Sequence, residues 1–187
     1  MLTIRRARRG DAATILALIR GLAAYERLSR YVTNTVATIR RDGFGRRRYF
    51  EALVCRRDGR PIGLALYFFT YSTFEGSPSL FLEDLFVVPE ERGRGAGLAL
   101  LRTLARIARQ RGCGRMEWAV LDWNRPAIRF YERLGARLRR ERIYTRLSGP
   151  ALRTLGDDGP ATGRRPRSAR PRRARGARAA RGRPARR

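Results

Sequence analysis

The sequence contains no histidine and no lysine, and only two of its 187 residues are cysteine. Without histidine the chain has no Ser-His-Asp triad, no imidazole base and no histidine-bound metal. The two cysteines, Cys55 and Cys113, form neither a disulfide framework nor a metal-binding spacing. These absences predict a cytoplasmic protein that uses no metal and relies on carboxylates as bases.

Long apolar runs are also missing. None approaches the roughly 18–20 residues that span a bilayer. The N-terminal stretch MLTIRRARRGD lacks the apolar core of a signal peptide. We therefore expect neither insertion into a membrane nor export.

The positive charge comes from arginine alone, and the formal net charge is +27. Residues 164–187 hold twelve of the arginines, with no acid and otherwise only Ala, Gly, Pro and one Ser. Uniform arginine with abundant Ala, Gly and Leu is typical of a GC-rich coding sequence; the alternative is a surface that attracts polyanions. We expect one folded domain over 1–150. Residues 151–187 are predicted to be a linker and a disordered arginine-rich tail, capable of non-specific contact with nucleic acid.

Apolar periodicity predicts alternating strands and helices. Strand-like runs occupy residues 2–5, 49–55, 62–70, 80–88, 116–121 and 138–144, and helical spacing follows Asp11 and recurs over 97–111 and 126–134. Asp11 is placed to cap the first helix, Asp42-Gly43 predicts a turn, and Asp58-Gly59 predicts a hairpin. The order of elements indicates an α/β or α+β fold with a mixed sheet.

A glycine-rich turn, Arg92-Gly93-Arg94-Gly95-Ala96-Gly97, lies between the strand at 80–88 and the helix at 97–111. Glycine lets the backbone approach a ligand and adopt positive φ. The start of the helix directs free N–H groups at an anion, and the two arginines add charge. This pattern predicts a pyrophosphate site. A structural loop and a dinucleotide-binding turn are the alternatives, although the latter usually lies near the start of a βαβ unit.

The surrounding motifs resemble those of the GNAT family of N-acetyltransferases. Val87-Val88-Pro89, the glycine-rich turn, a long helix, a strand and Asn124-x-x-x-Ile128-x-Phe130-Tyr131-x-x-x-Gly135 follow in that family's order. Other stretches are similar to the diamine (spermidine/spermine) acetyltransferase group: Leu22-Ala-Ala-Tyr25-Glu26, Asp42-Gly-Phe-Gly45, Tyr67-Phe-Phe-Thr-Tyr71, Leu82-Glu-Asp-Leu-Phe-Val87 and Asp122-Trp-Asn-Arg-Pro126. The resemblance covers about residues 2–144. It implies a twisted, mostly antiparallel sheet flanked by helices, acetyl-CoA as co-substrate and a homodimer.

The resemblance also implies roles for individual residues on the cofactor side. The backbone of Leu85 to Val87 would hold the pantetheine arm, and the glycine-rich turn would hold the pyrophosphate. Tyr131 would lie near the sulfur. The cofactor-binding residues implied are Leu85, Phe86, Val87, Arg92, Gly93, Arg94, Gly95, Ala96, Gly97, Leu98, Asn124, Ala127 and Tyr131.

Acetyl transfer requires a neutral amine, although a primary amine has a pKa of about 10. Without histidine, the available bases are Glu26 and the Glu83-Asp84 pair, acting directly or through water. We assign Glu83 as the catalytic base, and Tyr25, Glu26, Glu83 and Asp84 as acceptor-binding residues. Neighbours in a strand face opposite sides, so Glu83 and Asp84 share a cleft only if a bulge intervenes. Tyr131 is the second catalytic residue, since its hydroxyl can protonate or stabilise the departing thiolate. The alternatives are packing for Tyr131, helix capping for Asn124 and an exposed surface acid for Glu26.

The acceptor is predicted to be the primary amine of a small molecule: a diamine, a polyamine or a lysine-like amino acid. Ser72-Thr73-Phe74 departs from the diamine group, which has an acid and a Trp after the equivalent of Tyr71. Glu75, Glu117 or Asp122 are the acids that can replace the missing one. One alternative is acetylation of a protein or an aminoglycoside. Another is a nucleic-acid-binding protein in which the GNAT fold senses acetyl-CoA.

Overall fold

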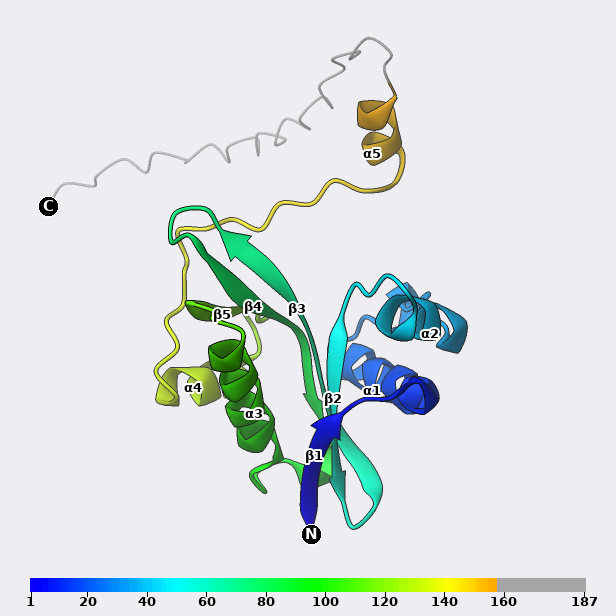
Figure 1. Cartoon of the computed structure of the whole chain (residues 1–187), viewed down its shortest axis with the longest axis vertical. Helices are drawn as coiled ribbons and strands as arrows, with labels where there is room; N and C mark the ends of the chain where they lie inside the picture. The colour runs from blue at the N-terminus through cyan, green and yellow to red at the C-terminus, as the bar shows by residue number, and fades with distance from the viewer. Residues whose placement is uncertain (158–187) are drawn as a thin grey trace, which may run out of the picture. The chain divides into compact units, whose positions relative to one another are not determined.

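The computed structural model describes residues 1–157, of which Met1–Ala136 form one compact unit and a second unit begins at Arg137. The first unit contains a five-stranded sheet in the order β1-β2-β3-β4-β5 (Figure 1). The first four strands pair antiparallel, and β5 pairs parallel with β4. The strands are β1 (Leu2–Arg6), β2 (Glu51–Arg57), β3 (Arg60–Ser72), β4 (Ser77–Val87) and β5 (Arg115–Trp118). The expected mixed, mostly antiparallel sheet is confirmed.

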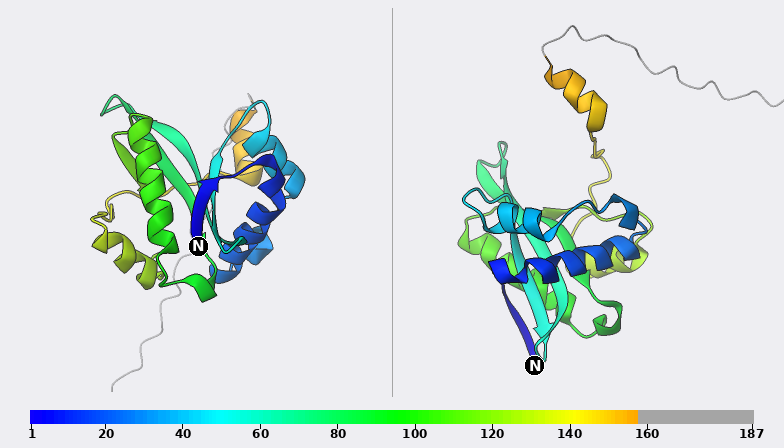
Figure 2. Two further views of the ribbon diagram at one scale, coloured as in Figure 1. Left: turned by 60° about the horizontal axis from the view of Figure 1, so that its bottom comes forward. Right: turned by 90° about the vertical axis from the view of Figure 1, so that its right-hand side faces the viewer.

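Helices cover both faces of this sheet. Figures 1 and 2 show α1 (Ala12–Tyr25) and α2 (Val36–Phe44) on one side, with α3 (Ala96–Gln110) and α4 (Arg125–Arg133) on the other. Short 3-10 turns occur at Arg9–Asp11, Ser29–Tyr31 and Pro89–Glu91. In the second unit, α5 spans Gly149–Gly156. Among residues 1–157, no helix has both the length and the apolar character needed to cross a membrane.

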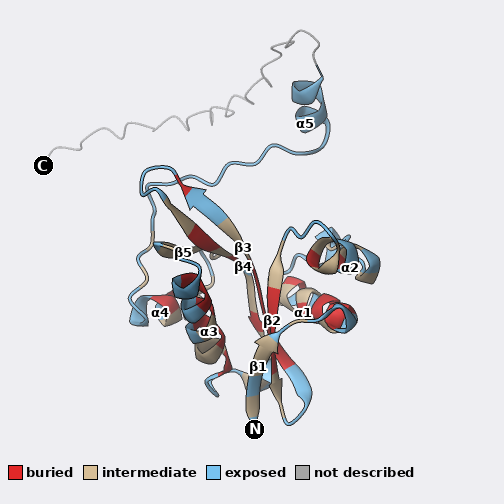
Figure 3. Cartoon of the chain, in the orientation of Figure 1, coloured by how far each residue is buried: buried red, intermediate tan, exposed pale blue. Residues whose placement is uncertain are grey.

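The core has two parts, one on each face of the sheet. On the α3 side the buried residues include Tyr67, Leu80, Leu82, Leu100 and Leu104. On the α1 side they include Ile15, Ile39, Val54, Leu64 and Phe86. Figure 3 shows these buried stripes on α1 and α3. Because each helix presents one apolar stripe and strand side chains alternate, the sheet is covered on both faces.

A β-bulge in β4 changes which way its acids point. Leu66 pairs with Asp84, but the next residue, Tyr67, pairs with Leu82, so Glu83 is the extra residue. Leu82 packs on the α3 side and Phe86 on the α1 side. Alternation on either side of the bulge therefore turns both Glu83 and Asp84 toward the α1 face.

Some local expectations are confirmed and others are wrong. Asp58 and Gly59 form the expected hairpin with φ of 49° and 80°. Asp42-Gly43 is not a turn but the last turn of α2, where a Cβ on Gly43 would lie 2.7 Å from the Phe50 ring. Asp11 does not cap α1 with its side chain. Its carboxylate accepts hydrogen bonds from Arg5 and from the backbone N–H of Arg8, which lower its pKa to about 2.

The expected strand over 138–144 is wrong. The structure assigns neither helix nor strand there, and Ile143 and Tyr144 are 86% and 77% exposed. An apolar β-pattern becomes a strand only when another strand pairs with its backbone groups, and the described part of the chain shows no such pairing for this segment. The arginine-rich tail at 164–187 lies outside the described residues.

Candidate active site

The strands β4 and β5 part beside the two acids. Their pairing covers Ser79–Leu82 of β4 and ends at Trp118, the last residue of β5. β4 itself continues to Val87 and stays paired with β3 on its other edge. The second edge of β4 over 83–87 has no strand neighbour among the described residues, so its backbone groups are open to a ligand. It includes Leu85 to Val87, which the family resemblance assigns to the pantetheine arm.

The glycine-rich turn lies directly beyond this open edge. Gly93 and Gly95 adopt φ of 72° and 84°, which favours glycine, and α3 begins at Ala96. Ala96 is buried and Leu98 is half-buried, so the first turn of α3 is fixed against the core. Its free N–H groups suit an anion such as a pyrophosphate.

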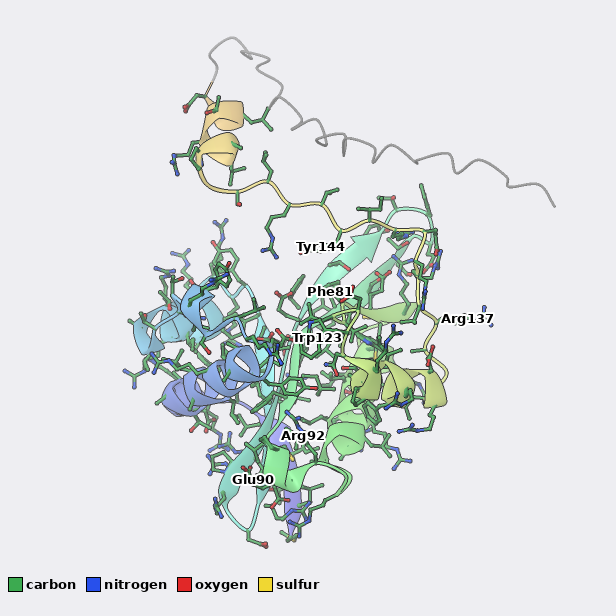
Figure 4. The ribbon with its side chains drawn as sticks, turned by 180° about the vertical axis from the view of Figure 1, so that it is seen from behind. Phe81, Glu90, Arg92, Trp123, Arg137 and Tyr144 are labelled. Carbon is green, nitrogen blue, oxygen red and sulfur yellow. The ribbon has the colours of Figure 1, made fainter. Side chains whose placement is uncertain are left out.

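Arg92 turns back from this loop over the open edge. Its Nε donates to the carbonyl oxygen of Val87 at 3.0 Å, and its guanidinium lies 4.3 Å from the centre of the Tyr25 ring. Figure 4 shows Arg92 and Trp123 between α1 and α4, and the Trp123 ring lies 5.9 Å from that of Tyr25. The guanidinium is thus held beside the backbone expected to contact acetyl-CoA.

Asn124 joins α4 to α1. Its Oδ1 accepts from Ala127 N–H at 3.3 Å and from the Tyr25 hydroxyl at 3.1 Å. The capping role considered from the sequence is therefore present, together with a contact to an expected acceptor residue. Phe86 lies in the α1-side core, so only its backbone faces the open edge.

Three acids gather where the bulge and the end of α1 meet. Glu83 is exposed, whereas Asp84 is half-buried. Burial, followed by the negative charges of Glu83 and Glu26, raises the pKa of Asp84 to about 6. Burial also raises the pKa of Glu26. The cluster is an anionic site that attracts an ammonium group and that contains a carboxyl titrating near neutral pH.

Tyr131 lies on the other side of the gap, on α4. Its ring packs against Trp118 with 5.1 Å between ring centres, and the side chain is buried. Burial and the charge of Glu26 raise its pKa to about 12. The hydroxyl therefore keeps its proton at neutral pH and is a hydrogen-bond donor, while the ring also serves the packing role considered above.

An open groove of about 780 Å³ lies next to this region, between α1 and the end of β4. Tyr25 and Phe86 line it, but Glu83, Asp84 and Tyr131 do not. We place the candidate site at the acids and the open edge of β4, because there a carboxyl with a raised pKa lies beside backbone groups that no strand pairs with in residues 1–157.

Sequence reasoning missed the support behind the glycine-rich turn. Glu91 accepts from Arg57 at 2.6 Å and from Arg94 at 3.0 Å. Arg94, expected to contact the pyrophosphate, is thus paired with an acid. No signal in the sequence links Arg57, which lies on another strand, to this loop.

The chain resembles known acetyltransferases in both sequence and structure. The sequence profile of the acetyltransferase (GNAT) family matches residues 20–136. Thialysine N-epsilon-acetyltransferase of Sus scrofa is 42% identical over 142 residues, which cover 72% of this chain and 83% of that protein. Spermidine/spermine N(1)-acetyltransferase-like protein 1 of Homo sapiens is 36% identical over 140 residues, covering 71% of this chain and 20% of that protein. An integron cassette protein from the mobile metagenome of V. cholerae has a TM-score of 0.71 and 25% identity, covering 83% of this chain and 98% of that chain.

Proposed function

The chain belongs to the acetyltransferase (GNAT) family and is an acetyl-CoA-dependent N-acetyltransferase acting on a small-molecule amine, and we propose that the acceptor is the side-chain amine of a lysine-like amino acid. The observation that carries the proposal is the acid cluster of Glu26, Glu83 and Asp84 beside the open edge of β4. It offers one concentrated anionic site for one ammonium group. The 42% identity to a thialysine acetyltransferase supports the same acceptor class.

The residues on the cofactor side fit acetyl-CoA. We propose that the open backbone of 85–87 binds the pantetheine arm, and that residues 93–98 bind the pyrophosphate with N–H groups at the start of α3. Asn124 and Ala127 line the same channel, and Arg92 supplies a positive charge at its mouth. The co-substrate supplies the thioester. In this arrangement the acids and Tyr131 would face the thioester from opposite sides.

The carboxylates prepare the amine. A lysine-like side chain arrives as an ammonium ion and must lose a proton before its nitrogen attacks the thioester carbonyl. We propose that Glu83 and Asp84 act as a coupled pair, because the charge of Glu83 raises the pKa of Asp84. Asp84 is the base of the pair, since burial and the neighbouring negative charges raise its pKa to about 6, close to neutral pH. This revises the assignment of the proton transfer to Glu83 alone.

Tyr131 acts at the other end of the reaction. When the bond between carbon and sulfur breaks, negative charge collects on the sulfur. A phenol with a pKa of about 12 is too weak an acid to surrender its proton fully to a thiolate. We propose instead that Tyr131 stabilises the thiolate by donating a hydrogen bond.

The experiment that tests this proposal is an acetyl-CoA turnover assay that follows thiol release with a panel of amines. We expect the highest kcat/KM with thialysine or lysine, lower values with diamines, and little turnover with an aminoglycoside or a protein N-terminus. Acetyl-CoA alone should raise the melting temperature at millimolar concentration. No thiol release with any small amine contradicts the acceptor assignment. An unchanged melting temperature contradicts the cofactor site.

Three further expectations belong to this proposal. We propose a homodimer on the family resemblance, and Phe74, which is 97% exposed, is an apolar side chain that a second copy can cover. We propose a cytoplasmic location because Cys55 and Cys113 are both free thiols. We also propose that the domain ends near residue 150 and that any nucleic-acid contact by the arginine-rich tail is non-specific.

A further inference from the structure

A row of polar side chains runs along one face of the sheet, from the acid cluster toward the β3–β4 hairpin. In β4, Leu80 and Leu82 pack on the α3 side, so Ser79, Phe81 and Glu83 face the α1 side. Met116 and Trp118 of β5 also pack on the α3 side, which turns Arg115 and Glu117 toward the α1 side. The register places Arg115 beside Ser79 and Glu117 beside Phe81.

Arg115 lies at the end of this row that is nearest to the β3–β4 hairpin. Its NH1 donates to Glu75 Oε1 at 2.7 Å and to the Ser72 hydroxyl at 3.1 Å, and its Nε lies 3.0 Å from Glu117 Oε2. Ser72 is buried, so the hydroxyl that accepts from Arg115 is itself held in place. One arginine therefore joins the hairpin tip to β5 and forms ion pairs with two acids.

The spacing of the row matches the spacing of charges in a polyamine. Strands rise by about 3.3 Å per residue, so Glu117 is about 7 Å along the sheet from Glu83, and Arg115 about 13 Å. Phe81, labelled in Figure 4, stacks on Phe68 between them, with ring centres 5.2 Å apart. An acceptor with several ammonium groups separated by short methylene chains would lie on this face, next to Glu117 and Glu75. Asp122 is in the turn before α4 and is not part of the row.

We propose that Arg115 is a specificity-determining residue that limits the acceptor to amines with a single cationic end at the acid cluster. By pairing with Glu75 and Glu117, it occupies the anions that a second or third ammonium group requires. Its positive charge also offsets part of the negative charge that would attract such a group. This inference rests on the proposed function, because it concerns which small amine the same site accepts.

Glu75 and Glu117, which the sequence offered as replacements for the missing acid of the diamine group, thus pair with an arginine of the same chain. Glu75 and Glu117 are close enough to the row to bind an ammonium group, but each is bound to Arg115 instead. Removing the guanidinium while keeping the apolar stem of the side chain should release both Glu75 and Glu117. Arg115→Met makes this change.

The test compares kcat/KM for spermidine and for thialysine in wild-type enzyme and in Arg115→Met. The ratio of spermidine to thialysine should rise about tenfold, since two partly exposed ion pairs each contribute a factor of about three. Arg102→Met is the matched control, because it removes one exposed arginine from α3 and leaves the row intact. Adding Glu75→Gln and Glu117→Gln to Arg115→Met should return the ratio to the wild-type value.

The outcomes separate this inference from the proposed function. A wild-type enzyme that acetylates neither amine overturns the proposed function. A wild-type enzyme that acetylates thialysine, with a ratio that Arg115→Met changes no more than Arg102→Met does, overturns the role of Arg115 alone. If Arg115→Met fails to fold, Arg115→Gln, which also removes the guanidinium but keeps a polar, uncharged side chain, is measured by the same criterion.

Discussion

Arg57 on β2 donates from its Nε to Glu91 at 2.6 Å, and this ion pair fastens the loop before α3 to the sheet. The guanidinium also donates to the carbonyl of Arg94 at 3.3 Å. Glu91 is only 17% exposed at its side chain, so the pair is better shielded from solvent than most surface ion pairs. The expected pyrophosphate loop is therefore held in shape before any ligand arrives.

Glu91→Gln should raise the KM for acetyl-CoA by about tenfold, because a charged hydrogen bond that orders the loop is lost. The kcat should stay within about twofold. The same change should have little effect on a pantetheine thioester, which lacks the pyrophosphate. Steady-state kinetics with the two thioesters measure both effects.

Glu90→Gln is the control for that variant, since Glu90 is an exposed neighbour with the same charge. Equal changes in KM for Glu90→Gln and Glu91→Gln would show that the effect comes from losing a negative charge and not from losing the ion pair with Arg57. An equal effect on both thioesters would show that the pair does not act through the pyrophosphate.

Tyr131→Phe should lower kcat by about 10²-fold and leave the KM for acetyl-CoA within about twofold. The hydroxyl acts when the thiolate departs, while the ring contact with Trp118 is kept. Tyr144→Phe, at a residue 77% exposed, should leave kcat unchanged. A loss below about threefold in Tyr131→Phe would mean that the residue only packs.

The kcat/KM for thialysine should rise with pH through an acid limb near 6, because Asp84 must lose its proton to act as the base. The negative charge of Glu26 helps to raise that pKa. Glu26→Gln should therefore move the acid limb to lower pH, as seen in profiles measured from pH 4.5 to 9. Glu132→Gln, which removes an exposed acid from α4, should not. If Glu26→Gln and Glu132→Gln shift the acid limb equally, the limb reports the titration of a group other than Asp84.

The local parts of the site could be predicted from the sequence. The glycine-rich turn lies between an apolar strand and a periodic helix, and each of these signals is local. The hairpin at Asp58-Gly59 was predictable for the same reason, since positive φ at both residues favours this pair. The place of Asn124 at the start of α4 also follows from its own neighbours.

Features that depend on pairing between distant segments could not be predicted. The bulge that turns Glu83 to the same face of the sheet as Asp84 arises from the register between β3 and β4. The contacts of Arg115 join two segments, the β3–β4 hairpin and β5, that are distant in the sequence. The failure at 138–144 has the same origin, because a strand pattern says nothing about whether a partner strand exists.

Asp84→Asn should stabilise the fold at neutral pH even though it lowers activity. The pKa of Asp84 is raised to about 6 in the folded protein from an ordinary 3.8, so the folded state holds this proton more tightly than the unfolded state does. That contribution to stability is complete below pH 4 and is lost as the pH rises through 6. Asparagine has no charge to desolvate, so at pH 8 the variant should be more stable than the wild type by about 1–2 kcal/mol, and at pH 4 nearly equal. Chemical denaturation at both pH values measures the difference, with Asp122→Asn as an exposed control. An Asp84→Asn variant that is less stable at pH 8 would show that the carboxylate is held by favourable contacts and is not a strained base.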